Sequence, residues 1–140
     1  MTAAKTSIIK KYHNKKAYLK VKGIIQNPAN LRQFPLDFEC RIDTGFDGGI
    51  LIPHWHLADA KSIGVEPSLT NIILADGRKI PAYVCLAHLQ EIEAHNLPAP
   101  GIPIVLVICG NRDGSLLGMD SLKNHFISFD GPAQTFTITV

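Results

Sequence analysis

Polar and apolar residues alternate along most of the chain, in short segments that turn residues separate. Residues 36–42 (LDFECRI) show the pattern most clearly, with four apolar side chains on one face and three charged side chains on the other. A period of two residues is typical of a strand with one buried face. The sequence therefore predicts a strand over 36–42, which runs directly into the loop Asp43-Thr44-Gly45-Phe46-Asp47-Gly48-Gly49.

Further strands are predicted between other turn signals, at 18–25, 50–52, 69–75, 79–89, 102–109, 126–129 and 136–140. Asp76-Gly77 separates two of them and is a strong hairpin signal, because both central residues of a type I′ turn need positive φ. A helix is predicted over 53–63, with Pro53 at its start and Gly64 just past its end, and a helical turn over 119–123. These elements predict a mostly β, barrel-like domain with one or two short helices.

The length of 140 residues and the hydrophobic content of 46% bound the function. A chain of this size forms one domain, and its apolar content excludes disorder. A site that needs two similar halves must take the second half from another chain. The apolar runs fall short of the ~18–20 residues that cross a bilayer, so we expect no membrane partner.

Positive charge is concentrated at the N-terminus. Residues 1–22 hold seven lysines and no acid, and the rest of the chain holds seven bases against twelve acids. We divide the chain into a basic arm over 1–17 and a domain over 18–140. The arm lacks interleaved aromatic residues and arginine, which favours a solvated terminus over a nucleic-acid site.

Three cysteines, Cys40, Cys85 and Cys109, are widely spaced and include no CxxC pair. This usage fits reduced core thiols better than disulfides or a thiolate zinc site. The N-terminus also lacks the apolar segment of a secretory signal. We therefore expect a cytoplasmic protein.

The residues best suited to chemistry are Asp43, Thr44 and Gly45. An aspartate at the point where a hydrophobic strand breaks into a Gly-rich loop is held by rigid backbone and is open to a cleft. The hydroxyl of Thr44 can fix a neighbouring backbone or a partner chain, and Gly45 lets another backbone approach closely. The alternative is a β-turn in which Asp43 caps its own loop.

A second motif, Leu116-Leu117-Gly118, again lies between a predicted strand and a short helix. The two motifs together, with the hairpin at Asp76-Gly77 between them, resemble the retropepsin-like aspartic proteases of clan AA. Phe46 after the Asp-Thr-Gly triplet makes the chain most similar to the prokaryotic single-domain subgroup that carries DTGF. The resemblance covers roughly residues 20–130.

The resemblance implies a closed retropepsin-like barrel that acts as a homodimer on a peptide or protein substrate. In this arrangement Asp43 of each chain would form a catalytic dyad, and Thr44 would stabilise the dyad and the dimer floor. Two carboxylates that share one proton can both deprotonate a water and protonate a carbonyl oxygen. The single Asp-Thr-Gly triplet requires an isologous dimer.

The substrate-binding residues implied by the resemblance fall in two segments. Gly45 and Asp47 would contact the peptide backbone, and Phe46 would line the substrate pocket. Residues Ala75, Asp76 and Gly77 would form the tip of a flap that closes over an extended peptide. Neither a cofactor nor a metal is implied.

Two departures from better-known members leave a second function open. Phe46 replaces a small residue, and Met119 stands where retroviral relatives use an arginine that braces the loop. A non-proteolytic, dimeric peptide- or protein-binding module on the same fold is therefore the alternative function. Asp47 and Asp120 are competing second carboxylates, but a substrate-binding role for Asp47 and a helix-capping or pairing role for Asp120 are favoured.

Metal-binding patterns are weaker. The spacing of Asp43, Gly45 and Asp47 imitates the start of a calcium loop, but the twelfth position is His54, where a bidentate glutamate is needed. His54 and His56 lie two residues apart, which on a helix directs them to different faces. The sequence therefore predicts no metal site.

Overall fold

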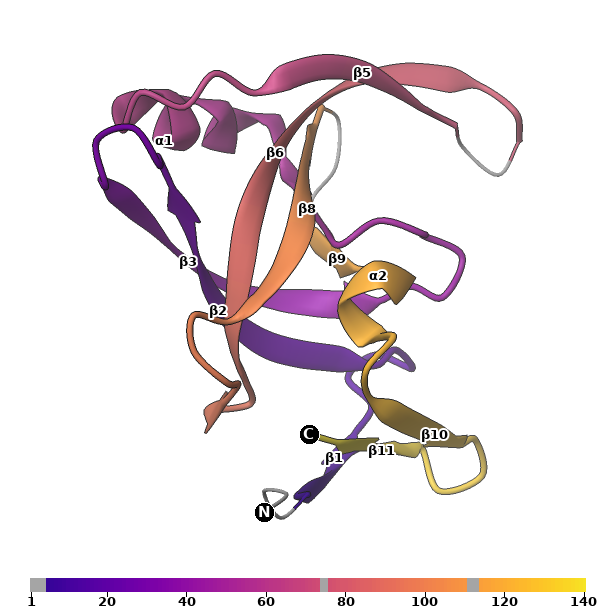
Figure 1. Cartoon of the computed structure of the whole chain (residues 1–140). Coiled ribbons are helices and arrows are strands. Elements are labelled where there is room, and N and C mark those ends of the chain that lie inside the picture. The colour runs from indigo at the N-terminus through magenta and orange to yellow at the C-terminus, as the bar shows by residue number, and fades with distance from the viewer. Residues whose placement is uncertain (1–4, 74–75, 111–113) are drawn as a thin grey trace.

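Six strands close into a β-barrel in the computed structural model, which describes residues 5–73, 76–110 and 114–140 (Figure 1). Around the barrel the strands are β2 (Tyr18–Gln26), β3 (Gln33–Ile42), β9 (Ser115–Leu117), β4 (Ile50–Pro53), β8 (Ile102–Cys109) and β6 (Lys79–Ile92), which returns to β2. The pairs β3–β9 and β4–β8 are parallel, and the other neighbours in the ring are antiparallel. The prediction of a mostly β barrel is confirmed.

The alternation in residues 36–42 determines which face of β3 is buried. Leu36 and Cys40 are buried and Phe38 and Ile42 partly so, whereas the intervening charged residues are more exposed. The same alternation from the other strands fills the interior of the barrel. Its fully buried large side chains include Leu19, Ile25, Ile52, Leu89, Ile92, Ile104, Leu106, Ile108 and Leu117.

Closure between β2 and β6 depends on Gly23. The register of this pair shifts between Lys22 and Gly23, and a Cβ on Gly23 would collide with the carbonyl oxygen of His88 on β6. A bulge of this kind bends a strand and increases its twist, which a closed barrel requires. The missing side chain at Gly23 lets the two strands meet.

The hairpin of β5 (Ser68–Ile73) and β6 extends beyond the barrel (Figure 1). Strand β6 has 14 residues, and its residues 79–84 pair with β5, its residues 82–89 with β8 and its residues 87–92 with β2. The sequence prediction of a hairpin around Asp76-Gly77 is confirmed. A short strand β7 (His95–Asn96) pairs with the other end of β6 and was not predicted.

Two short helical segments precede β5, in place of the single helix predicted over 53–63. The first turn is a 3-10 helix, η1 (His54–His56), and α1 (Leu57–Ser62) follows it. Helix α2 (Met119–Leu122) confirms the predicted helical turn. No helix within the described ranges is long and apolar enough to span a membrane.

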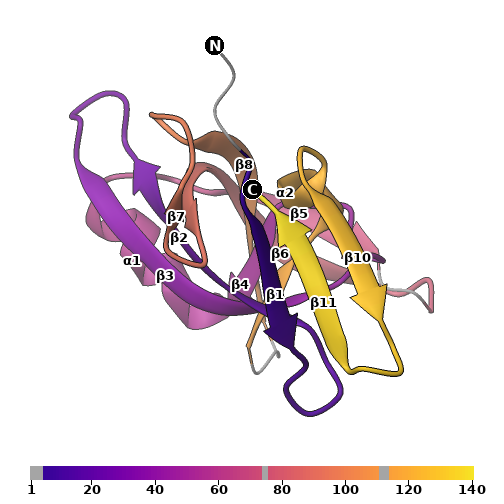
Figure 2. The same ribbon diagram turned by 90° about the horizontal axis from the view of Figure 1, so that it is seen from below.

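The chain ends form a separate sheet of three strands in the order β1 (Ser7–Lys11), β11 (Thr135–Thr139) and β10 (Phe126–Asp130) (Figure 2). Residues 7–11 of the basic arm thus pair with the last strand of the same chain. Phe136 and Ile138 of β11 are buried and join the barrel core. On the barrel side, Lys10 of β1 forms an ion pair with Glu93, next to β6.

His125 lies where α2 leads into β10. Its Nδ1 atom lies 3.3 Å from the carbonyl oxygen of Thr139, and its buried Nε2 atom has no hydrogen-bond partner among the described residues. Burial lowers the pKa of His125, and the hydrogen bond to Thr139 opposes this effect only in part. With Nδ1 donating to Thr139, protonation would place a second N–H at the buried Nε2, where no acceptor is available.

Acid should therefore weaken the packing of the chain ends. Since the folded-state pKa of His125 lies below the ordinary value of 6.5, the unfolded state binds the proton more readily, and stability falls as pH falls through about 6.5. We expect the melting temperature of the wild type to decrease between pH 8 and pH 5, and the decrease to be smaller in His125→Gln. His54→Gln, at an exposed position, is the control and should follow the wild type. Equal slopes in all three proteins would contradict this role of His125.

Candidate active site around Asp43

Backbone hydrogen bonds fix the position of Asp43 at the end of β3. The amide of Ile42 donates to the carbonyl oxygen of Ala17 at 2.8 Å, and the amide of Asp43 donates to that of Leu117 at 3.0 Å. Strand β3 is thus held by the start of β2 on one side and by the end of β9 on the other. Asp43 leaves the barrel at a point where the backbone is fixed from both sides.

The loop after Asp43 crosses the loop between β9 and α2. The amides of Gly118, Met119 and Asp120 donate to the carbonyl oxygens of Gly49, Phe46 and Gly48, at 2.8, 2.8 and 3.2 Å. Three successive donors at the start of α2 are therefore satisfied by the loop that carries Asp43. The two motifs identified in the sequence, about 70 residues apart, form one hydrogen-bonded unit.

Gly118 allows this close crossing. A Cβ on Gly118 would collide with the carbonyl oxygen of Gly48 and would lie 2.7 Å from the carbonyl oxygen of Phe46. Any side chain at this position would separate the two loops. The requirement for glycine after the two leucines therefore has a steric cause.

The carboxylate of Asp43 is oriented by its own loop. Its Oδ1 atom accepts a hydrogen bond from the amide of Gly45 at 3.0 Å, and the residue is partly exposed. The second oxygen has no hydrogen-bond partner within the described part of the chain. Thr44 is exposed beside it, so its hydroxyl faces outward from a single copy of the chain.

Phe46 packs inward against the loop crossing. Its ring lies over Gly48, where a Cβ would come within 2.5 Å of the ring edge, and against Gly118. Phe46 also contacts a second apolar cluster, whose buried members are Leu51, Ala82, Val107, Cys109 and Leu116 and whose partly buried members include Ile72, Ile80 and Val84. The ring therefore connects the Asp43 loop to the base of the β5–β6 hairpin.

The two other candidate acids differ in their partners. The carboxylate of Asp120 lies 2.9 Å from Nζ of Lys123, one turn later in the same helix, which agrees with the predicted pairing role. Asp47 is exposed and forms no ion pair or side-chain hydrogen bond with any described residue. Asp47 is therefore free to bind a ligand. Met119, on the crossing loop, is 42% exposed.

The predicted flap tip lies at the end of the β5–β6 hairpin. Both oxygens of Asp76 are taken up by Arg78, whose amide and Nε lie 2.9 and 2.6 Å away, and this lowers the pKa of Asp76. Gly77 has a φ of +85° and open space around it. Ala75 lies outside the described residues. The hairpin extends on the same side of the barrel as the loop that connects β3 to β4 (Figure 1).

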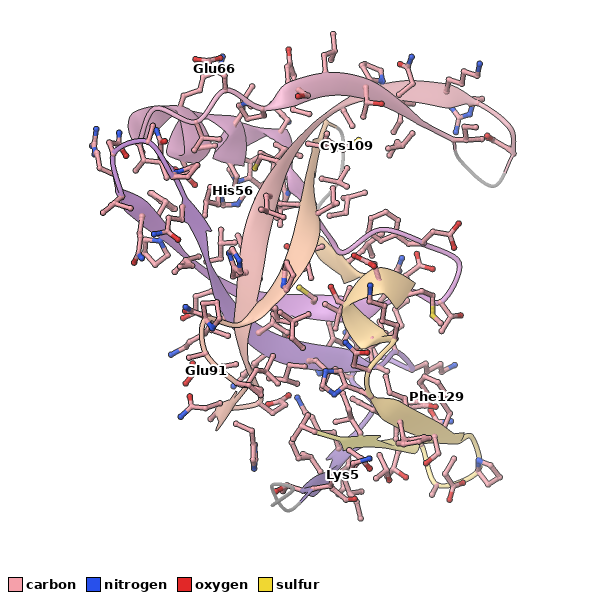
Figure 3. All side chains as sticks on the ribbon, in the orientation of Figure 1. Lys5, His56, Glu66, Glu91, Cys109 and Phe129 are labelled. Carbon is pink, nitrogen blue, oxygen red and sulfur yellow. The ribbon has the colours of Figure 1, made fainter. Side chains whose placement is uncertain are left out.

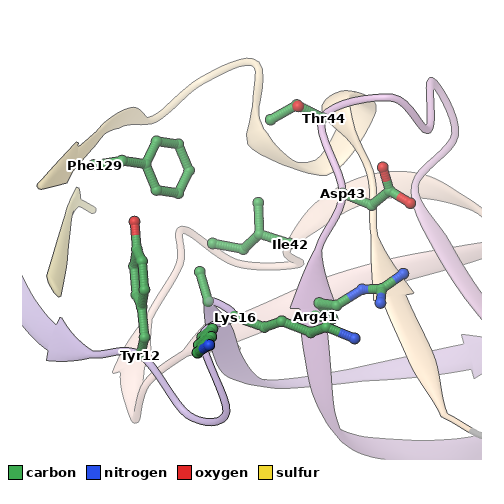
Figure 4. Close-up of a pocket in the computed structure, with 9 residues that line it drawn as sticks. Tyr12, Lys16, Arg41, Ile42, Asp43, Thr44 and Phe129 are labelled. Atoms are coloured by element: carbon green, nitrogen blue, oxygen red, sulfur yellow. The ribbon is translucent and has the colours of Figure 1, made fainter. Parts of the chain in front are cut away.

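A pocket of about 440 Å³ opens on the other side of Asp43 (Figure 4). Asp43, Thr44 and Ile42 form one wall, and residues from the start and the end of the chain form the others. These further lining residues are Tyr12, Lys15, Lys16, Ala17, Arg41 and Phe129. The sequence predicts a solvated arm for the lysines, and the pairing of β2 with β3, continued by the hydrogen bond from Ile42 to Ala17, brings them next to Asp43.

The cysteines are unsuited to nucleophilic chemistry. All three are free, and burial raises the pKa of Cys40 to about 12, with a smaller contribution from the charge of Glu39. Burial likewise raises the pKa of Cys85 to about 11. Cys109 lies at the end of the barrel away from the terminal sheet, which Phe129 marks in Figure 3. Thiolates are the reactive form, so the thiols of Cys40 and Cys85 are inert near neutral pH.

Metal ligands do not gather anywhere in the described ranges. Among these residues there is no group of three or more His, Cys, Asp or Glu side chains placed to hold a metal ion. His56 instead contacts the carboxylate of Asp59 at 3.0 Å and the ring of Phe38. Trp55 is 57% exposed, with the rings of His54 and His56 beside it.

Comparisons with protein-family models, with curated proteins and with solved structures find no match to this chain. A function for the site is therefore inferred from its geometry and from the two motifs that build it.

The crossing of the two loops predicts a large effect of Gly118→Ala. The new methyl group collides with backbone atoms that hydrogen bonds hold in place, so we expect a loss of at least about 1–3 kcal/mol in the free energy of unfolding. Gly131→Ala is the matched control, because a Cβ there meets nothing within 4 Å. Thermal unfolding of both variants measures the difference. A melting temperature for Gly118→Ala equal to that of the control would show that the crossing is not tightly packed.

Proposed function

We propose that the protein is a homodimeric aspartic endopeptidase with a retropepsin-like fold. The observation that carries the proposal is the hydrogen-bonded crossing of the Asp43 loop with the Leu117–Met119 loop. This crossing holds a partly exposed carboxylate on rigid backbone at the surface. Preorganised catalytic groups require such support, because a shift of 1 Å costs much of the rate.

The reaction requires a second copy of Asp43. One carboxylate accepts a proton from water while the other, protonated, donates to the carbonyl oxygen of the peptide. Asp120 is engaged by Lys123. A two-fold axis close to Asp43 would place two identical carboxyl groups side by side. Two carboxyl groups in contact share one proton, because both cannot stay charged at short range.

The terminal sheet offers a surface for this association. Strands β1 and β10 each pair only with β11 among the described residues, so each has one free edge. Ile9 and Phe126, on the outer face of these strands, are 73% and 72% exposed. Unpaired edges and exposed apolar side chains favour contact with another chain. Both chain ends pair with each other within one chain, so the outer edges of β1 and β10 are the edges left for a second copy.

In each half of the proposed reaction the dyad accepts one proton and donates one. The water oxygen bonds to the carbonyl carbon, one carboxylate takes the water proton, and the other gives its proton to the carbonyl oxygen. When the tetrahedral intermediate collapses, the C–N bond breaks, the leaving nitrogen receives a proton from one carboxyl group, and a hydroxyl of the intermediate returns its proton to the other as the C=O bond re-forms. The two carboxylates end with one shared proton, as they began.

The peptide would bind in an extended form between the loop and the hairpin. Gly45 and the unpaired carboxylate of Asp47 are available to its backbone. Phe46 supplies an apolar surface that is continuous with the cluster at the base of β5 and β6. Closure of the hairpin, with Asp76 and Gly77 near its tip, would exclude water from the reacting bond.

Asp43→Asn tests the proposal, with Asp37→Asn as the control. Both substitutions remove one negative charge from the same face of β3, but Asp37 is exposed and distant from the loop crossing. We expect Asp43→Asn to lose cleavage of an unstructured protein such as casein by at least about 10³-fold, because the asparagine cannot exchange a proton with water. Its melting temperature and solution mass should match those of the wild-type dimer. Activity that survives in Asp43→Asn would exclude the dyad.

The alternative, a dimeric binding module, predicts a different result with a statine-type transition-state mimic. A competent dyad should bind the mimic in the wild type and lose it in Asp43→Asn, since the mimic's hydroxyl replaces the attacking water. A dimer that binds peptides equally well in both proteins, without cleavage, would support the binding module.

A shared proton also predicts the pH dependence of the rate. One carboxylate must be charged and the other protonated, so kcat/KM should pass through a maximum on the acidic side of neutrality. The melting temperature must be measured at each pH, because protonation of His125 weakens the fold in the same range. A rate that stays flat from pH 4 to pH 8 would contradict the dyad.

A further inference from the structure

We infer that the pocket beside Asp43 binds a carboxylate of the substrate peptide, so that the enzyme prefers an acidic residue close to the bond it cleaves. This inference rests on the proposed function and specifies its substrate class. It is carried by three cations that meet in one pocket with the candidate catalytic residue and have no acidic partner.

The three cations are Lys15, Lys16 and Arg41. Lys15 and Lys16 are exposed and Arg41 is partly buried, and none of the three forms an ion pair within the described ranges. Asp43 contributes the only negative charge among the lining residues, so the pocket carries a net charge of +2. An anion that enters the pocket would complete the missing pairing.

Strand geometry places Arg41 beside Asp43. The two residues are separated by Ile42, whose side chain points toward the core, so both lie on the opposite face of the extended chain. Figure 4 shows Arg41 and Lys16 running next to each other below Ile42. The guanidinium of Arg41 presents a planar set of donors, which matches the two oxygens of a carboxylate.

The two lysines are held by a tight turn between β1 and β2. The backbones of His13 and Lys16 exchange two hydrogen bonds, at 2.9 and 3.1 Å, across Asn14 and Lys15. Asn14 and Lys15 have φ values of +50° and +63°, as a two-residue hairpin turn requires. Ala17, the next residue, accepts the hydrogen bond from Ile42. The lysine backbone is thereby fixed against the strand that ends at Asp43.

An aromatic wall closes the pocket opposite Asp43. The rings of Tyr12 and Phe129 both pack on the buried ring of Phe136, with centroids 6.2 and 6.3 Å away. Figure 4 shows Tyr12 and Phe129 facing the same space as Ile42. Tyr12, Phe129 and Ile42 thus form the apolar side of the pocket, and Arg41 and Asp43 extend from the other face of β3.

The expected anion is a carboxylate because the proposed substrate is a peptide, whose anionic groups are the side chains of glutamate and aspartate and the C-terminus. In the proposed dimer the two-fold axis would generate a second pocket, so that one lies on each side of the dyad. The preference is therefore expected near the cleaved bond on either side.

Matched peptides provide the test. A library of cleavable peptides with an amidated C-terminus is compared in glutamate and glutamine versions at each position around the scissile bond. We expect wild-type kcat/KM to be roughly three- to tenfold higher with glutamate at one position, and this ratio to fall toward one in Lys16→Gln and in Arg41→Gln. Lys61→Gln, an exposed lysine on α1, is the control for the same charge change and should keep the ratio. Free-acid versions of the same peptides distinguish a side-chain carboxylate from a terminal one.

Binding measurements separate this inference from the proposed activity. Asp43→Asn protein, in which cleavage is not required, should bind the glutamate peptide more tightly than the glutamine peptide, and less so at high salt. Adding Lys16→Gln or Arg41→Gln should remove the difference, and adding Lys61→Gln should not. Equal binding of the two peptides, binding of neither, or tighter binding of an oligonucleotide of similar length would overturn the inference. Discrimination in binding without any cleavage in the wild type would support the pocket and refute the peptidase.

Discussion

The backbone hydrogen bonds between the Asp43 loop and the Leu117–Met119 loop are the interaction on which the site depends. They satisfy donors at the start of α2 that so short a helix leaves unpaired, and they use carbonyl oxygens of a loop that has no regular structure of its own. The loop before α2 thus supplies the amide donors, and the Asp43 loop supplies the carbonyl acceptors. Gly118 makes this possible, because any side chain there would occupy the space of the Gly48 carbonyl group.

This crossing divides the surroundings of Asp43 into two sides with different chemistry. On one side, Phe46 continues into the apolar cluster below the β5–β6 hairpin. On the other side lies the pocket with Lys15, Lys16 and Arg41. A carboxylate between an apolar surface and a cationic pocket is placed to act on a chain that carries both kinds of side chain. The hydrogen-bonded crossing keeps these two surfaces in a fixed relation to the carboxylate of Asp43.

The terminal sheet links the ends of the chain to the site. Phe136 on β11 is buried in the barrel core and supports both Tyr12, which follows β1, and Phe129 on β10. Within the described residues the same sheet leaves two strand edges unpaired and two large apolar side chains mostly exposed. Association through this sheet and substrate binding beside it would therefore be coupled, since both use the position of β1. His125 lies between α2 and β10 and contacts Thr139 of β11, so its protonation would weaken the terminal sheet.

Local sequence patterns determined the elements of this protein and the identity of its central residues. The alternation in residues 36–42 specified the buried face of β3. Alternate side chains of a strand point to opposite faces, so the apolar set can be buried in only one orientation. Asp76-Gly77 and Gly64 marked a turn and a helix end through their backbone preferences. The first turn of the helix after Pro53 and the short strands β1 and β7 were not specified, because tertiary hydrogen bonds decide such short elements.

Only the tertiary structure decided what surrounds Asp43. The sequence placed Lys15 and Lys16 in a charged arm, since nothing in their neighbourhood along the chain refers to residue 43. Their position depends on the pairing of β2 with β3 and on the hydrogen bond from Ile42 to Ala17, which join residues distant in sequence. The register of β2 against β3, which sets Tyr18 opposite Arg41, decides this position, and the alternation within each strand does not specify that register. The sequence thus determined that one carboxylate would stand at the end of a strand with one buried face, and the fold decided that three cations, none of them paired with an acid of the described residues, stand beside it.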